Sequence, residues 1–228
     1  MLAGERSFGT NGKENFLFPL EIMWLTQGSY SHTYSHNGCY AMDFQGAKYE
    51  NGDVVRRYRC PYYAPFSCKL VRRWGSSSPM VVWESLDQVN FIDGTVGYAC
   101  IGFCHDDDVM SFTIGEIRTQ GQLIGHTGTY GASGDHVHIE AVKGKYDGYH
   151  ENSYGVWMLD NSTWLYDCTG VNDTDLYKDY YVNHQGTTVT YNWREFTNIG
   201  PTPTPAYPSR RESKFPWAIY SRKLRDTR

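Results

Sequence analysis

The sequence predicts a mostly β fold, an antiparallel sheet sandwich or open barrel with loop insertions. Aromatic residues make up 16% of the 228 residues and include 19 Tyr and 7 Trp, residue types that favour strands over helices. Short apolar runs recur between groups of turn residues, which is the pattern of a β domain. No long stretch shows helical periodicity, so a mainly helical protein is not expected.

The runs expected to form strands are bounded by turn residues such as Gly, Pro, Asn and Asp. In order along the chain they are residues 54–60, 67–74, 80–84, 97–103, 122–125, 136–142, 154–159 and 187–191. Residues 163–179 have room for a short helix at best. The chain therefore reads as one β domain rather than an alternation of strands and helices.

The length supports one well-packed domain with appendages. Residues 30–199 are expected to form that domain, with residues 1–29 as an N-terminal segment packed on it. Residues 200–208 alternate Pro with other residues, which predicts an extended polyproline II linker. Residues 209–228 form a basic aromatic tail with a net charge of +5 on an otherwise acidic chain, whose overall charge is −4. That tail is either a docking segment or a solvated end of the chain.

Composition also limits the classes of function. The net charge of −4 gives no reason to expect a nucleic acid partner. The six cysteines show no CxxC spacing, so they do not predict a thiolate zinc site; they are either bridged, as Cys60 with Cys68 and Cys100 with Cys104, or reduced in the core. The sequence begins without an apolar signal segment and contains no run of 18 apolar residues, so neither secretion nor a membrane span is expected.

One predicted strand alternates polar and apolar residues. In a strand over residues 136–142, His136, His138 and Glu140 share one face, and apolar side chains occupy the other. Two imidazoles at positions i and i+2 can approach the same ion or water, so this face is expected to line a cleft. The His-x-His pattern alone is a weak signal for a metal site.

Two further segments carry residues of matching chemistry. His36 and Asp43 offer a nitrogen and an oxygen ligand, which zinc accepts. They are seven residues apart, so in one unbroken strand they would face opposite ways, and Asn37-Gly38 offers a turn that corrects this. His105 lies where a predicted strand ends and acidic loop residues follow. Taken singly, each of these residues is more simply explained as part of the surface or a loop.

Taken in order, these segments resemble the lysostaphin/LytM-type zinc endopeptidases, which have the duplicated hybrid motif fold. The best stretch begins at His105 and passes through the Gly-containing turn of residues 112–125 and the Gly/Ser-rich loop of residues 127–134 to His136-Val137-His138-Ile139-Glu140. Upstream, residues 64–71 resemble the family's Ala-Pro-x-x-Gly-x-Val strand, with Cys68 in place of Gly. The ordered set covers residues 30–145 and is far more specific than any single part.

The resemblance implies roles for individual residues. It implies one zinc ion per chain held by His36, Asp43 and His138, with His105 and His136 off the metal and beside its bound water. The common family spacing is His-x3-Asp, whereas this chain has His-x6-Asp, which we interpret as a subfamily trait; His32 is the rival first ligand. Glu140 is either an acceptor that orients a ligand imidazole or a plain surface charge.

The resemblance also implies an activity, namely hydrolysis of peptide bonds in the stems or cross-bridges of bacterial peptidoglycan. Without a secretion signal, a bacteriophage source is expected. The enzyme would then be a virion tail-tip component that penetrates the wall at entry, or an endolysin held in the host cytoplasm before lysis. In the tail-tip case, residues 209–228 are expected to dock onto other virion proteins. The alternative is a non-catalytic scaffold or wall-binding module that keeps the fold without turnover.

Overall fold

The computed structural model describes residues 1–28, 34–51, 53–75 and 79–170, and the backbone of three short strand segments at 181–182, 188–189 and 193–195. The predicted linker at 200–208 and the basic tail at 209–228 lie outside the described residues. His32, the rival ligand, also lies outside them.

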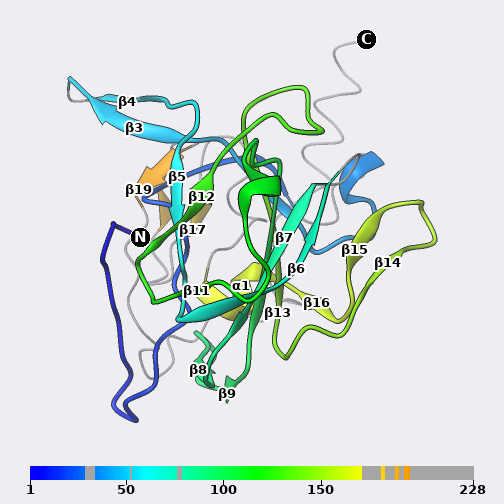
Figure 1. Cartoon of the computed structure of the whole chain (residues 1–228). Helices are drawn as coiled ribbons and strands as arrows, with labels where there is room; N and C mark the ends of the chain where they lie inside the picture. The colour runs from blue at the N-terminus through cyan, green and yellow to red at the C-terminus, as the bar shows by residue number, and fades with distance from the viewer. Residues whose placement is uncertain are drawn as a thin grey trace.

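A nine-stranded antiparallel sheet forms the centre of the molecule (Figure 1). Its strands follow the order β11-β6-β7-β10-β13-β2-β1-β19, with β16 paired to β13, so the sheet is open. The prediction of a mostly β fold built from antiparallel sheets is confirmed. The bounds are β1 Ile22–Gln27, β2 Met42–Phe44, β6 Cys68–Trp74, β7 Met80–Ser85, β10 Cys100–Cys104, β11 Ile117–Arg118, β13 Val137–Val142, β16 Ser162–Thr163 and β19 Trp193–Glu195.

Two-stranded antiparallel ribbons surround this sheet. They are β3 Ala47–Glu50 with β4 Asp53–Arg56, β5 Pro61–Tyr63 with β12 Leu123–His126, β8 Val89–Asn90 with β9 Val96–Gly97, β14 Tyr149–Glu151 with β15 Trp157–Leu159, and β17 Tyr181–Val182 with β18 Thr188–Val189. The β3–β4 and β14–β15 hairpins project at opposite sides of the molecule in Figure 1.

Helical structure is short in the described part of the chain. It consists of the α-helix α1, Leu165–Thr169, and two 3-10 turns, η1 Tyr34–His36 and η2 Val109–Ser111. Helix α1 falls inside the stretch 163–179 that was expected to hold at most a short helix. No helix among the described residues has the length and apolar character needed to cross a membrane.

The main core lies against one face of the central sheet. The apolar side of β13 points into it, where Val137, Ile139 and Ala141 are 0% exposed. The segment before β1 contributes to the same core: Phe16 meets Phe66 edge-on at a ring-centroid distance of 4.7 Å. Each such buried ring stabilises the fold by about 1.5–3 kcal/mol. Residues ahead of β1 are therefore an integral part of the described core.

All six cysteines are buried free thiols. The sequence left open whether the cysteines form disulfides or are reduced residues of the core, and the structure supports the second alternative. Burial raises the pKa of each thiol above its ordinary value, so the cysteines stay uncharged near neutral pH and behave as small apolar side chains.

Candidate metal centre

His36 is the last residue of η1, and its ring is completely buried. The Nδ1 atom lies 3.0 Å from the carbonyl oxygen of Gly28, which accepts only if Nδ1 carries the proton. The Nε2 atom is then left with its lone pair. After His36 the chain reverses at Gly38, whose φ of +71° is accessible to glycine without strain, and the turn at Asn37-Gly38 leads into β2.

Asp43 and His138 face each other across neighbouring antiparallel strands. They are direct partners in the pairing of β2 with β13, which places their side chains within contact distance. The His138 Nδ1 atom lies 3.1 Å from Asp43 Oδ1, and its Nε2 atom lies 3.1 Å from Glu140 Oε1. With the Nε2 proton donated to Glu140, the lone pair of the neutral ring sits on Nδ1.

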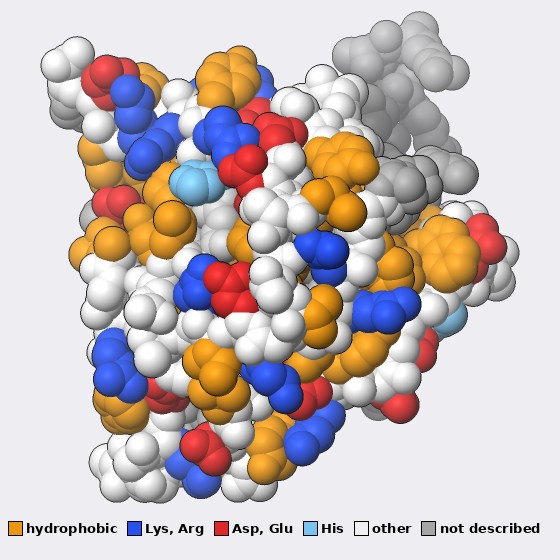
Figure 2. Space-filling model, viewed as in Figure 1, with side chains coloured by type: hydrophobic (Ala, Val, Ile, Leu, Met, Phe, Trp, Pro, Cys, Tyr) orange, Lys and Arg blue, Asp and Glu red, His pale blue; other side chains and the backbone are white. Residues whose placement is uncertain are grey.

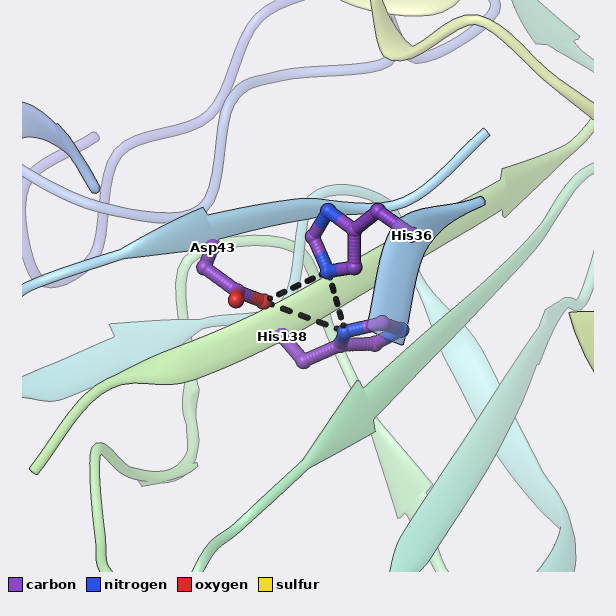
Figure 3. A group of neighbouring side chains, drawn as sticks. All are labelled: His36, Asp43 and His138. Carbon is purple, nitrogen blue, oxygen red and sulfur yellow. Dashed lines mark hydrogen bonds and ion pairs between the residues drawn. The ribbon is translucent and has the colours of Figure 1, made fainter. Parts of the chain in front are cut away.

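Three ligand atoms therefore converge from three segments of the chain (Figure 3). His36 Nε2 lies 3.2 Å from Asp43 Oδ1 and 3.1 Å from His138 Nδ1, and the third side of the triangle is also 3.1 Å. Ligands at about 2.0–2.1 Å from a tetrahedral zinc ion lie roughly 3.3–3.4 Å apart. The triangle thus fits three corners of such a site and leaves the fourth corner for water.

The electrostatics of this triangle favour a positive charge at its centre. Burial alone would raise the pKa of Asp43, but hydrogen bonds with His138 and His36 outweigh it and hold the pKa well below its usual range. Burial lowers the pKa of His138, whereas hydrogen bonds to Asp43 and Glu140 raise it, with a net pKa of about 10. A metal ion that binds here must displace the proton held on His138, because a ligand imidazole is neutral.

His105 and His136 lie beside the triangle without joining it. Each ring donates from Nδ1 to a backbone carbonyl, His105 to Tyr130 at 2.9 Å and His136 to Gly134 at 2.7 Å, which leaves Nε2 as the basic nitrogen. The two ring centroids are 4.5 Å apart. His136 Nε2 lies 3.7 Å from Asp43 Oδ2, so it faces the same small volume as the ligand atoms.

The backbone of His105 is held in a left-handed conformation, with φ of +76° directly after β10. Such a conformation costs about 1–3 kcal/mol for a residue other than glycine. The next residue offsets this, because the buried Asp106 carboxylate accepts the His126 N–H at 2.7 Å and the Tyr62 hydroxyl at 3.2 Å. Burial, followed by repulsion from His138, lowers the pKa of His105 to about 4, so its ring is neutral near pH 7.

The polar face of β13 is covered over most of its length. Glu140 is 0% exposed and His138 is 8% exposed, so of the polar residues on this face only the half-buried His136 remains partly open to solvent. The reason is strand β15, whose Leu159 N–H donates to Glu140 Oε2 at 2.7 Å. The interpretation of Glu140 as a plain surface charge is therefore wrong, and its carboxylate holds the His138 ring and β15 together.

This geometry predicts a measurable role for Glu140 in metal binding. Glu140→Gln is expected to weaken zinc affinity about 10- to 100-fold, because a neutral amide orients and polarises the His138 ring less strongly. Competition titration against a chelator of known affinity measures this change. Glu84→Gln is the matched control, since the half-buried Glu84 accepts the Tyr146 N–H at 2.9 Å away from the triangle. Equal zinc affinity in both variants and the wild type would contradict the role.

The remaining histidines do not contribute to the described cluster. His126 ends β12, and its backbone is held by Asp106. His150 is exposed on β14 and pairs with Asp160. His184, like His32, falls outside the described residues.

Fold and site together define a class: a mostly β protein of antiparallel sheets with a buried His-Asp-His cluster suited to a metal ion and two flanking histidines. No known protein-family profile matches the chain. The chain is 32% identical over 188 residues to Morphogenesis protein 1 of Bacillus phage B103, a match that covers 82% of this chain and 46% of that protein. It therefore spans less than half the length of this curated relative.

Solved structures with a similar course of the chain include a zinc-containing peptidase and an antimicrobial peptidase. The catalytic domain of the antimicrobial peptidase lysostaphin from Staphylococcus simulans has 18% identity and a TM-score of 0.37, over 55% of this chain and 84% of that one. A zinc-containing peptidase from Vibrio cholerae has 17% identity and a TM-score of 0.38, over 60% of this chain and 42% of that one. The chain is similar to lysostaphin-type zinc peptidases.

Proposed function

We propose that this chain is a zinc-dependent endopeptidase that hydrolyses peptide bonds of bacterial peptidoglycan. The observation that carries the proposal is the buried triangle of His36, Asp43 and His138 with His105 and His136 beside it. Two imidazoles and one carboxylate with a fourth position open are the ligand set of a catalytic rather than a structural zinc site. The non-catalytic alternative is disfavoured, because every polar position that the family pattern requires is occupied.

The chemistry divides between the metal and the side chains around it. Zinc held by His36 Nε2, Asp43 Oδ1 and His138 Nδ1 would polarise a peptide carbonyl and lower the pKa of a bound water. His136 and His105 each present Nε2 with its Nδ1 proton tied to the backbone. Either ring can accept the proton of the attacking water and return it to the leaving amine. The resulting imidazolium would also stabilise negative charge on the carbonyl oxygen.

The setting we propose is a bacteriophage, and the similarity to Morphogenesis protein 1 of Bacillus phage B103 supports it. In that setting the chain acts as a wall-penetrating part of the virion tail, or alternatively as a lysis enzyme. We further propose that residues 209–228 bind another virion protein, since they combine seven basic residues with aromatic side chains. Peptidoglycan is then the substrate, and a tail protein is the second partner.

The direct test is metal content together with wall hydrolysis. Purified protein is expected to hold about one zinc ion per chain, the stoichiometry of a single three-ligand site, and to release new amino groups from purified peptidoglycan. A chelator should abolish that release and added zinc should restore it. A zinc-loaded protein that releases sugars but no amino groups, or one that binds no metal tightly, would remove the endopeptidase assignment.

A further inference from the structure

One arginine that contacts the segment before His136 is held in place without a carboxylate partner among the described residues. Arg56 ends β4, and its Nη2 donates to the carbonyl oxygen of Asp135 at 3.2 Å. Its guanidinium also stacks over the Tyr58 ring, 4.6 Å from the ring centroid. Asp135 directly precedes His136 in the chain, so the guanidinium is bonded to the backbone of the residue next to this histidine.

The loop at Asp135, whose carbonyl oxygen accepts the hydrogen bond from Arg56, is itself hydrogen-bonded to the segment that carries Arg56. The Asp135 carboxylate is 4% exposed and accepts two hydrogen bonds, from the Thr127 hydroxyl at 2.7 Å and from the Arg59 N–H at 3.0 Å. The second bond joins the chain just after β4 to the residue before His136. The backbone of the segment that carries Arg56 is therefore tied by hydrogen bonds to the residue before His136.

Charge pairing distinguishes Arg56 from Arg59 and Lys48, two other basic residues of this part of the chain. Figure 2 shows Lys and Arg side chains near the β3–β4 hairpin at the upper left. Arg59 pairs with Asp107 at 3.2 Å and also with Asp108, and Lys48 pairs with Glu50 at 3.1 Å. No carboxylate of the described residues pairs with Arg56. Its exposed side chain is oriented by the Asp135 carbonyl oxygen and the Tyr58 ring. Most of its planar fork of N–H donors thus remains open to a ligand.

We propose that Arg56 binds a free carboxylate of the substrate peptide close to the scissile bond. A planar guanidinium matches a carboxylate in a bidentate pair, and the anionic groups of a peptide substrate are carboxylates. Because the guanidinium is already stacked and hydrogen-bonded, it loses little conformational freedom on binding. This role of Arg56 rests on the proposed endopeptidase function. Binding of the carboxylate by Arg56 would make the enzyme selective for acidic over amidated peptides.

Two pairs of synthetic wall peptides test this selectivity. Within each pair, one peptide has a free carboxylate and the other has the corresponding amide. The first pair carries this group before the scissile bond, and the second pair carries it after the bond. The wild type is expected to cleave one carboxylate peptide with a kcat/KM roughly 10- to 100-fold above that of its amide. Arg56→Gln should lose this preference, mainly through KM, and should cleave the amide peptide as the wild type does. Its zinc content should be unchanged.

Arg57→Gln is the matched control, because Arg57 is the exposed neighbour whose backbone N–H, 2.9 Å from the Gly46 carbonyl oxygen, anchors the same segment. An equal loss of preference in Arg57→Gln would reveal a general effect of positive charge and overturn the assignment to Arg56. Calorimetric titration of both peptides separates this inference from the proposed function. Equal affinity of the wild type for both overturns the carboxylate site even if both are cleaved, whereas selective binding without cleavage removes only the proposed activity.

Discussion

His138→Ala is expected to remove zinc from the protein and to reduce peptide hydrolysis to the background rate. The substitution deletes one of the three ligand atoms and leaves Glu140 Oε1 buried without its imidazole partner. It also removes the contact of Nδ1 with Asp43, so the two remaining ligand atoms are held less well. Elemental analysis after gel filtration should fall from about one zinc per chain to nearly none, since three protein ligands hold a catalytic zinc.

Three further variants test whether zinc is lost only when a residue of the triangle is replaced. His36→Ala should behave like His138→Ala, and it disturbs less because its other nitrogen contacts only the Gly28 carbonyl among the described residues. His150→Ala removes an exposed histidine that pairs with Asp160 and should keep both zinc and activity. His32→Ala should also keep zinc. Loss of zinc from His32→Ala with retention in His36→Ala would transfer the first ligand position to His32.

His105→Ala and His136→Ala are expected to keep zinc and to lose about 10²- to 10⁴-fold in hydrolysis, the usual contribution of general acid–base groups. Neither ring supplies an atom to the triangle, yet the two rings lie beside it in contact with each other, tilted by 45°. Zinc content and kcat for a synthetic wall peptide, measured on the same preparation, distinguish this role from metal binding.

His126→Ala is the control for these two variants, because His126 ends β12 and its backbone N–H, not its ring, donates to Asp106, the neighbour of His105 in the chain. It should retain most of the activity. Zinc loss in His136→Ala would make His136 a ligand, and a fully active His105→Ala would exclude it from proton transfer. Loss of activity in only one of the two would identify which ring is required.

The sequence anticipated the strands whose patterns are long enough to read. The alternation over residues 136–142 corresponds to β13, and residues 67–74 contain β6. By contrast, β2 has only three residues, too few to show any periodicity, and was not expected. The apolar run that forms β1 at Ile22–Gln27 carried a readable signal and was missed.

The candidate site shows where local patterns stop being informative. The glycine of the turn after His36 was visible in the sequence, and it gave a reason for the wide spacing to Asp43. The meeting of Asp43 with His138 depends on the register of two strands far apart in the chain, which one sequence does not determine. The burial of Glu140 depends on β15, which lies in a segment without a counterpart in the family pattern.

Because the Glu140 carboxylate contacts both, metal binding at the triangle and docking of the β14–β15 hairpin onto the sheet are thermodynamically coupled. One oxygen accepts from the His138 ring and the other from the Leu159 amide, so a single buried group belongs to both. Zinc that fixes the ring therefore also favours the docked hairpin, and a ligand that holds the hairpin against the sheet must raise zinc affinity by the same factor. A ligand that contacts the β14–β15 hairpin would thereby act on the metal site through the single side chain of Glu140.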